Sequence, residues 1–236
     1  MRALNITLPR EYYHFLKYDP RGSAELQALL DVVTVNQTWF FRESAPVVAW
    51  REQVLPALLT RNHWVRIWSA GCSTGEEPYT VAMLLRDAYP AVNKNRFDIL
   101  ATDLSRRALA TARAATYDPY SLRHTEAYWK TKYFESTSDG RMTVRRDVQQ
   151  LLRFEHGNLF TGEFNVRPNS IDAVLCRNVI IYFDEKSRQR VLMNLYNALK
   201  PGGYLMLGHS ESLAHVASPF EVTKLGKFIM YRKGSE

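Results

Sequence analysis

Segments with the apolar pattern of strands alternate along the chain with segments that have the apolar spacing of helices. Short apolar runs typical of buried strands occupy five segments: residues 64–70, 97–102, 151–155, 171–176 and 204–208. Segments with the apolar spacing of helices accompany them: residues 24–33, 76–89, 106–115 and 184–199. Strands that alternate with helices pair in parallel, so the pattern predicts an α/β fold, a mostly parallel sheet covered by helices on both faces. Two extended segments, residues 220–225 and 227–232, predict a terminal antiparallel hairpin.

Capping and terminating residues predict where several helices begin and end. Ser44 precedes an apolar segment that carries Pro46 in its first turn, which is typical of an N-cap and a helix start. We expect this helix to run to about Thr60, with a bend at Pro56. The Pro-Gly-Gly sequence at residues 201–203 is a strong terminator for the helix predicted before it.

The order of these elements predicts one main domain with two additions. Residues 1–33 have the character of a remnant of an N-terminal helical domain, too short to bury a core alone. Residues 34–236 form the main domain. The stretch at residues 117–147 interrupts the alternation with a helical piece around residues 126–132 and two extended pieces that flank residues 138–140. We expect it to be a small α/β excursion from the main sheet.

Composition narrows the class of protein without choosing a function. The chain has 236 residues, and its 46% hydrophobic content excludes disorder. Two cysteines, Cys72 and Cys176, cannot build a disulfide framework or a multi-cysteine zinc site. Residues 1–5 carry no secretory signal, and no apolar run approaches the roughly 18 residues of a membrane span, so we expect a cytoplasmic protein without direct membrane insertion. The net charge of +7 favours an acidic partner: nucleic acid, an anionic membrane surface or an acidic protein.

The turn after the first predicted strand is the first candidate for chemistry. In an open parallel sheet, ligands bind beyond the carboxyl ends of the strands, where the strand order reverses. This turn begins at Gly71 and is followed by the acidic pair Glu76 and Glu77. Its spacing is not GxGxxG, and carboxylates stand where a pyrophosphate would need free amides, so it favours a cationic ligand over a dinucleotide. An ordinary strand-to-helix turn is the alternative.

Polar residues also follow the next three predicted strands. Asp103 ends the second strand and can accept hydrogen bonds from both hydroxyls of a ribose, although for Asp103 taken alone the sequence slightly favours capping of the helix that follows Ser105. Asn158 follows the third strand, and Arg177 and Asn178 follow the fourth. The first four predicted strands are thus each followed by polar residues at the same edge of the sheet. Structural stability alone does not require four polar strand ends at one edge, so together they predict a binding site there.

Six motifs together resemble the CheR family. They are TVNQTWFFRE (residues 34–43), AGCSTGEEPYT (70–80), ATD (101–103), CRNVIIYF (176–183), LKPGGYL (199–205) and GHSESL (208–213). CheR proteins are bacterial chemotaxis methyltransferases that move a methyl group from S-adenosylmethionine to glutamate side chains of chemoreceptors. The resemblance covers the chain from Thr34 onward and implies a Rossmann-like class I methyltransferase sheet, with residues 34–236 as the S-adenosylmethionine-binding catalytic domain.

The resemblance also implies roles for individual residues. The implied cofactor-binding residues are Asn36, Thr38 and Arg42 on the linker side, Gly71 in the turn, Glu76 for the methionine part, Asp103 for the ribose, Asn158 and Leu159 for the adenine, and Arg177 and Asn178 for the central part. Arg42 and Tyr182 are the implied catalytic residues, nearest the transferring methyl group; an aromatic ring packed under the sheet edge is the alternative for Tyr182. The implied cofactor is S-adenosylmethionine, with S-adenosylhomocysteine as product and no metal, since none of the six histidines has metal spacing.

The residue chemistry agrees with such a reaction. A glutamate carboxylate with a pKa of about 4.3 is already an anion at neutral pH, so methylation needs no general base. The sequence at residues 208–212 is not a G-x-S-x-G nucleophile elbow. Because transfer from a sulfonium to a carboxylate removes both charges, a dry site and in-line positioning can supply most of the catalysis.

The implied partner is the cytoplasmic helical region of methyl-accepting chemotaxis receptors, and we expect a monomer that does not bind nucleic acid. Two other functions stay open. An RNA or DNA methyltransferase would suit the charge of +7, but Arg177-Asn178-Val179-Ile180 stands where amino-nitrogen methyltransferases often carry an Asn/Asp-Pro-Pro-aromatic motif. A non-catalytic adaptor that senses S-adenosylmethionine is the third candidate, and the presence of Arg42 and Tyr182 argues mildly against it.

Overall fold

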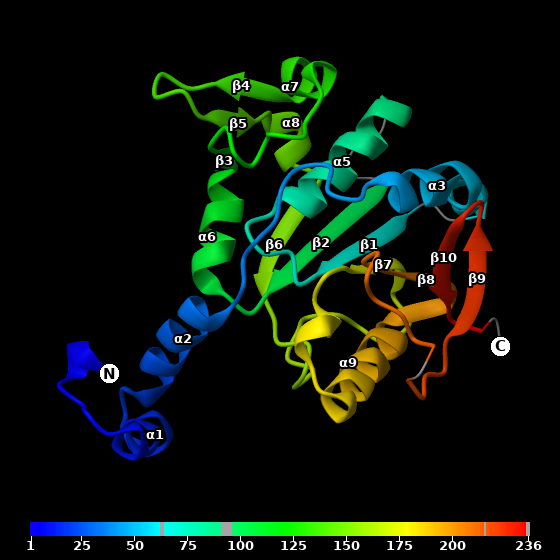
Figure 1. Ribbon diagram of the computed structural model, residues 1–236. Helices are drawn as coiled ribbons and strands as arrows, with labels where there is room; N and C mark the ends of the chain where they lie inside the picture. Colours follow the sequence, from blue (N-terminus) through cyan, green and yellow to red (C-terminus); the bar gives the residue numbers. More distant parts are fainter. Residues whose placement is uncertain (62–63, 91–95, 215, 235–236) are drawn as a thin grey trace.

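The computed structural model describes residues 1–61, 64–90, 96–214 and 216–234. A sheet of seven strands forms its centre, in the order β6-β2-β1-β7-β8-β10-β9. The strands are β1 (Val65–Ala70), β2 (Phe97–Asp103), β6 (Leu152–His156), β7 (Ile171–Cys176), β8 (Leu199–Leu207), β9 (Glu221–Leu225) and β10 (Phe228–Arg232). The first five in the order are parallel, and β9 and β10 form the antiparallel hairpin at one edge (Figure 1). The predicted α/β class is confirmed.

The register brings the carboxyl ends of the parallel strands to one level. Ser69 of β1 pairs with Ala101 of β2 on one side and with Leu175 of β7 on the other. The chain proceeds outward from β1 through β2 to β6, and then returns to β7 on the opposite side of β1. The strand order therefore reverses between β1 and β7, which is where an open sheet of this kind leaves a crevice for a ligand.

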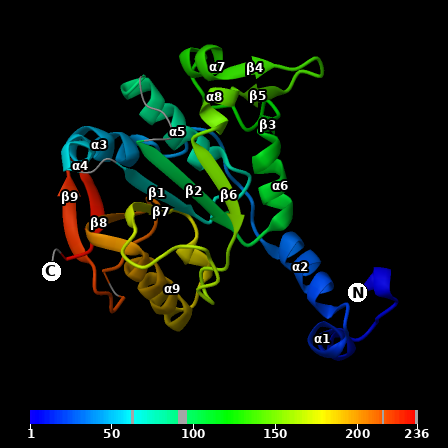
Figure 2. The same cartoon turned by 180° about the vertical axis from the view of Figure 1, so that it is seen from behind.

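Two apolar clusters cover the two faces of the sheet. Successive side chains of a strand point to opposite faces, and in β1 Ile67 belongs to one cluster while Trp68 belongs to the other. Helices α3 (Ala45–Gln53) and α5 (Glu76–Ala88) pack into the first cluster, and α9 (Glu185–Ala198) packs into the second. Figure 2 shows the helices on both faces from behind. The predicted cover of helices on both faces is confirmed.

A small unit projects from the main sheet between β2 and β6. After α6 (Arg106–Ala114) the chain forms an antiparallel sheet in the order β3-β5-β4, with two short helices (Figure 1). These elements are β3 (Thr116–Tyr117), α7 (Ala127–Tyr133), β4 (Phe134–Ser136), β5 (Met142–Val144) and α8 (Arg146–Gln149). The carboxylate of Asp87, at the end of α5, accepts hydrogen bonds at 2.6 Å from both Lys132 Nζ and Tyr128 Oη and so ties α7 to the main domain.

The N-terminal segment forms two helices, α1 (Pro9–Tyr18) and α2 (Gly22–Val33), after a short 3₁₀ turn, η1 (Arg2–Leu4). Figure 1 shows both helices projecting away from the sheet, with α2 closer to it. The carboxylate of Asp31 in α2 accepts a hydrogen bond from Ser105 Oγ at 2.8 Å, so α2 is attached to the start of α6. A domain boundary after residue 33 stays a prediction.

One predicted helix and one predicted cap are wrong in detail. The helix expected from Ser44 to about Thr60 is two helices, α3 and α4 (Leu55–Arg61), which separate at Val54. Proline lacks an N–H and collides with the carbonyl four residues earlier, so the chain breaks before Pro56 and restarts with it in the first turn of α4. Ser44 precedes α3, but its side chain makes no capping hydrogen bond. The predicted cap at Ser105 is confirmed, because its side chain accepts from the Ala108 N–H.

The Pro-Gly-Gly sequence does not separate the last helix from the next strand. Helix α9 ends at Ala198, and β8 begins at once with Leu199 and includes residues 201–203. The pairing with β7 shifts register between Ile171 and Ala173, opposite this point. Gly202 has a φ of 77°, which glycine adopts without strain, and its N–H donates to the Lys233 carbonyl at 2.9 Å. The three residues therefore form an irregular first part of the strand.

Candidate functional site

A cavity of about 510 Å³ opens at the carboxyl edge of the sheet. Its walls come from the linker after α2, the turn after β1, the end of β2 and the loops after β6 and β7. All the residues assigned to the site from the sequence line this cavity except Glu76. The lining residues among them are Asn36, Thr38, Arg42, Gly71, Asp103, Asn158, Leu159, Arg177, Asn178 and Tyr182. The fold therefore brings together residues that are up to 146 positions apart in the chain, from Asn36 to Tyr182. Their individual roles stay predictions.

The turn after β1 holds its shape through glycine and two backbone hydrogen bonds. The N–H groups of Gly71 and Cys72 donate to the Thr102 carbonyl at 2.8 and 2.9 Å. Gly71 has a φ of 86°, and a Cβ there would lie 2.5 Å from Val179 Cγ2 in the loop after β7. Since both the backbone conformation and the close approach exclude a side chain, glycine is required at this position.

Asp103 is held at the cavity wall by the backbone on either side. Its two carboxylate oxygens accept one hydrogen bond each, from the Ser73 N–H at 2.7 Å and from the Ser105 N–H at 2.8 Å. Burial raises the pKa of Asp103 although these hydrogen bonds oppose the shift. Each oxygen retains a lone pair, so both readings of Asp103 coexist: it orders the start of α6 and can still accept from a ligand.

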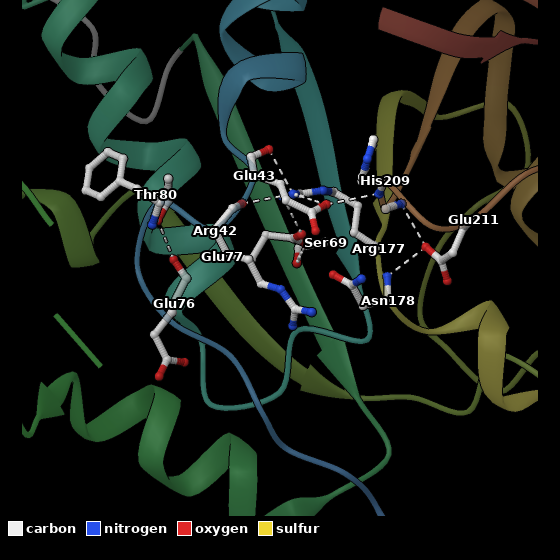
Figure 3. A network of polar contacts seen from close by, with 12 residues as sticks. Arg42, Glu43, Ser69, Glu76, Glu77, Thr80, Arg177, Asn178, His209 and Glu211 are labelled. Carbon is white, nitrogen blue, oxygen red and sulfur yellow. Dashed lines mark hydrogen bonds and ion pairs between the residues drawn. The ribbon is translucent and has the colours of Figure 1, made fainter. Parts of the chain in front are cut away.

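Of the two glutamates that begin α5, only Glu77 lines the cavity. The Glu76 carboxylate accepts from Thr74 Oγ1 at 2.6 Å and from Ser121 Oγ at 3.1 Å, and Figure 3 shows it pointing away from Glu77. Glu77 accepts from Ser69 Oγ at 2.6 Å, and burial raises its pKa. The sequence shows an acidic pair, but neighbouring helical positions face about 100° apart, so only the structure identifies the residue at the cavity.

The linker after α2 supplies the opposite wall. The Ser73 hydroxyl donates to Asn36 Oδ1 at 3.1 Å, which ties the linker to the turn after β1. The Arg42 guanidinium lies 4.6 Å from the centre of the Trp39 ring and donates to the Gln37 carbonyl at 2.8 Å. Tyr182, at the end of η2 (Ile180–Tyr182), is 60% exposed. The two predicted catalytic side chains therefore line one cavity, with Tyr182 on its solvent side.

Arg177 sits in a buried network beside the cavity. Its side chain is 4% exposed and forms ion pairs with Glu77 at 3.2 Å and with Glu43 at 3.3 Å (Figure 3). The Nε atoms of Arg177 and Arg42 are buried and make no hydrogen bond to any residue that the structure describes. Because an unsatisfied buried donor costs about 1–3 kcal/mol, both atoms favour a ligand with acceptor groups in this cavity.

Comparison with known proteins decides the family. The model of the CheR methyltransferase S-adenosylmethionine-binding domain matches residues 36–229. Chemotaxis protein methyltransferase 2 of Vibrio cholerae is 34% identical over 226 residues, which are 95% of this chain and 78% of that protein. The chemotaxis protein methyltransferase of Borreliella burgdorferi is 38% identical over 86% of this chain and 73% of its own length. The chain belongs to the CheR methyltransferase family.

Membership in the CheR family confirms the resemblance of the six motifs and the assignment to S-adenosylmethionine-dependent methyltransferases of chemotaxis. The cavity fits this cofactor. Its volume lies in the range of about 300–1,000 Å³ usual for small-molecule sites. The carboxylates of Asp103 and Glu77 in its wall suit a ligand with a sulfonium cation, and the unpaired Nε donors of Arg42 and Arg177 suit a ligand with acceptor groups.

Part of the cavity wall comes from residues 1–33, which the sequence analysis assigned to a separate N-terminal remnant. Leu30 and Val33 of α2 line the cavity of this CheR chain, although residues 1–33 carry none of the six motifs. Asp31, between them, anchors α2 to Ser105, two residues after Asp103. Apolar residues at helical spacing indicate only that one face of α2 is covered, so the sequence offers no signal that this face borders a cofactor site.

Glu211 of the GHSESL motif organises the loop after β7. Its carboxylate accepts from four backbone N–H groups: Gly208 and Asn178 at 2.7 Å, Val179 at 2.9 Å and Ile181 at 3.3 Å. Asn178 has a φ of 59°, a conformation that needs such support in a residue other than glycine. The family resemblance included the motif that contains Glu211, but only the structure shows that Glu211 accepts hydrogen bonds from the loop that leads to Tyr182.

Replacing Glu211 with glutamine is expected to lower the free energy of unfolding by about 2–3 kcal/mol. The amide nitrogen of glutamine cannot accept, so two of the four N–H groups would lose their acceptor, and the other two would keep a neutral acceptor in place of a charged one. Urea unfolding of the purified protein measures the change. Glu221→Gln, at an exposed position of β9, makes the same chemical change away from the loop and serves as control. Equal stability of the two variants would contradict a supporting role for Glu211.

No group of three or more His, Cys, Asp or Glu side chains among the described residues is arranged to hold a metal ion. Within the same part of the chain, no helix combines the length and apolar character needed to cross a membrane. Cys72 and Cys176 are both buried and unbonded to each other, and Cys72 lines the cavity.

Proposed function

We propose that the protein transfers the methyl group of S-adenosylmethionine to glutamate carboxylates in the cytoplasmic helical region of chemoreceptors, giving methyl esters. The observation that carries the proposal is the cavity itself: Arg42 and Tyr182 line it together with Asp103, at the edge where the strand order reverses. S-adenosylmethionine supplies an electrophilic methyl group on a positively charged sulphur. The curated relatives are named for methylation in chemotaxis, which supports the choice of substrate.

The residues of the chain would act by orientation and by exclusion of water. An incoming glutamate is already ionised, so the site needs a group that directs the carboxylate and no base that removes a proton. Arg42 supplies a cation whose position is restrained by its stack on Trp39. Tyr182 supplies a neutral hydroxyl on the solvent side of the cavity. One neutral donor beside one restrained cation can align the carboxylate without neutralising its nucleophilic oxygen.

For the cofactor we propose contacts that follow the walls of the cavity. Asp103 would accept from the ribose, Asn158 and Leu159 would flank the adenine, and Arg177 and Asn178 would border the central part. The Asn158 side chain already accepts from the Phe160 N–H at 3.0 Å, so its backbone is the part best suited to the adenine. Because Glu76 is held by Thr74 and Ser121 outside the cavity, we propose Glu77 as the carboxylate nearer the sulfonium.

The partner would be an acidic receptor segment. The net charge of +7 favours such a partner and predicts association that weakens with salt. We propose a monomer in the cytoplasm that does not bind nucleic acid.

Incubation with tritiated S-adenosylmethionine and receptor cytoplasmic fragments tests the function. Label on the receptor protein that is released by mild base indicates a methyl ester and supports the proposal. Stable label on added RNA or DNA would indicate a nucleic-acid methyltransferase. Binding of the cofactor without any transfer would indicate an adaptor that senses it. Either of the last two results would overturn the proposal.

The affinity for S-adenosylmethionine is expected to rise several-fold between about pH 5 and about pH 7. Burial raises the pKa of Asp103 and of Glu77, so both carboxyl groups hold protons at a higher pH than exposed ones do. As the pH falls toward these values, protonation removes the negative charge that attracts the sulfonium. Titration calorimetry at the two pH values measures the effect, with uncharged-sulphur S-adenosylhomocysteine as the control ligand. An equal pH dependence for both ligands would contradict an electrostatic role of these carboxylates.

A further inference from the structure

The linker that carries Arg42 has an unfavourable backbone conformation. Phe41 has a φ of 61° and Glu43 a φ of 45°, so both neighbours of Arg42 lie in the left-handed region. Each costs about 1 kcal/mol or more for a residue with a Cβ. Such a conformation persists only where surrounding contacts hold it. Those contacts determine where Arg42 lies in the cavity.

Arg177 supplies contacts to this backbone from the end of β7. Its NH2 group donates to the Arg42 carbonyl at 2.9 Å and to the Glu43 carbonyl at 2.8 Å. Its NH1 group donates to Glu77 at 3.2 Å, which fixes the plane of the guanidinium. Arginine can serve these acceptors together because its donors form a rigid planar fork. The linker is thereby bonded to the loop after β7.

The Glu43 side chain joins the linker to two loops at once. Its Oε2 atom accepts from Arg177 NH2 at 3.3 Å and from the His209 N–H at 3.0 Å, as Figure 3 shows. His209 belongs to the loop after β8, the loop that also contains Glu211. Glu43 itself does not line the cavity, and its side chain is 34% exposed. Its contacts therefore reach the cavity only through Arg177 and through the backbone of Arg42.

We infer that Glu43 is a positioning residue for the methyl transfer, acting through Arg42. The Glu43 carboxylate joins the linker to the loops after β7 and β8 and so holds the Arg42 guanidinium at the place where it meets the substrate carboxylate. The inference rests on the proposed function, which assigns that task to Arg42. Glu43 makes no contact with Asp103 or Asn158. Its one link to the proposed cofactor residues is Arg177, which Glu77 and two backbone carbonyls also hold, so we expect Glu43 to affect cofactor affinity less than turnover.

A double-mutant cycle between Glu43→Ala and Arg42→Ala tests the inference in the full-length protein. Glu43→Ala is expected to lower kcat about 10-fold, with less than about 3-fold change in the Kd for S-adenosylmethionine. In the Arg42→Ala background the same change is expected to lower kcat less than about 2-fold, because the group that Glu43 positions is gone. Glu43→Gln keeps one acceptor and is expected to fall between wild type and Glu43→Ala.

Glu52→Ala is the matched control. Glu52 lies on α3, pairs with Arg51 at 2.9 Å and is 59% exposed, so its replacement removes a glutamate–arginine pair to which neither Arg42 nor Arg177 belongs. It is expected to leave kcat within about 2-fold of wild type. The inference is overturned if Glu43→Ala lowers kcat by the same factor in both backgrounds. It is also overturned if the Kd for S-adenosylmethionine rises as much as kcat falls.

A second measurement keeps the inference separate from the proposed function. In protein labelled with 5-fluorotryptophan, the ¹⁹F resonance of Trp39, identified with Trp39→Phe, reports on the Arg42 guanidinium stacked over its ring. Glu43→Ala is expected to shift or broaden this resonance, and Glu52→Ala is not. A wild-type protein that methylates no receptor would overturn the proposed function, while a shifted Trp39 resonance would still show that Glu43 positions Arg42. An unchanged Trp39 resonance in Glu43→Ala would overturn the inference and leave the proposed function intact.

Discussion

Arg42→Ala is expected to lower the rate of methyl transfer about 100-fold, while the Kd for S-adenosylmethionine changes less than about 5-fold. The guanidinium lines the cavity, lies over Trp39 and is the cation placed to orient an incoming carboxylate. Its loss leaves the substrate carboxylate free to rotate away from the line of attack. Tyr182→Phe, which removes only the hydroxyl, is expected to have a smaller effect of about 10-fold on turnover. Single-turnover labelling of receptor fragments measures both rates.

Arg123→Ala provides the control for this experiment. The Arg123 guanidinium lies 4.3 Å from the centre of the Trp39 ring, so it shares the aromatic partner of Arg42, but it does not line the cavity. Its removal is expected to change turnover less than about 3-fold. Unchanged turnover in both Arg42→Ala and Tyr182→Phe would reject the assignment of these two residues.

Asp103→Ala is expected to weaken the binding of S-adenosylmethionine about 30- to 100-fold, equivalent to about 2–3 kcal/mol. The carboxylate keeps one lone pair on each oxygen for a ligand after it has accepted from the Ser73 and Ser105 N–H groups. Its loss removes charged acceptors for the ribose and part of the negative charge near the sulfonium. The turn after β1 also loses a partner at Ser73, which adds to the effect. Titration calorimetry measures the affinity directly.

Ser105→Ala separates the loss of a ligand contact from the loss of local order. The Ser105 side chain caps α6 and donates to Asp31, but its backbone N–H still donates to Asp103 in the variant. It is expected to lose about 1 kcal/mol of folding stability, with less than about 3-fold change in cofactor affinity. If Ser105→Ala weakens cofactor binding as much as Asp103→Ala, then Asp103 only orders the start of α6.

The sheet was predictable because its signals are local. The strands β1, β2 and β7 are short apolar runs buried on both faces, and each is followed by a turn and a helix, so the order of these elements follows from a few residues at a time. Asp103 at the end of β2 and Asn178 just after β7 could be identified in the same way, because each directly follows one of these apolar runs in the sequence. The errors at Pro56 and at residues 201–203 are errors of boundary. A bend was predicted at Pro56, where one helix ends at Gln53 and a second begins at Leu55, and a helix terminator was predicted at residues 201–203, which belong to β8.

Selection between neighbouring glutamates required the structure. Glu76 and Glu77 are chemically identical, and the rotation of α5 about its axis decides which of them meets Arg177. That rotation depends on packing of α5 against the sheet and against the small unit that contributes Ser121. No spacing within residues 70–80 contains this information.

The order of apolar runs and the six motifs were sufficient to predict the α/β class, the family and the edge of the sheet at which the structure has its cavity. These properties depend on residues close in the chain, whose spacing is itself the physical cause of a strand, a turn or a cap. Tertiary structure alone decided that α2 walls the cavity, that Glu77 faces it, and that Glu43, Arg177 and Glu211 hold its loops. Those contacts join residues up to 166 positions apart, and groups so distant in sequence become partners only after the sheet has assembled.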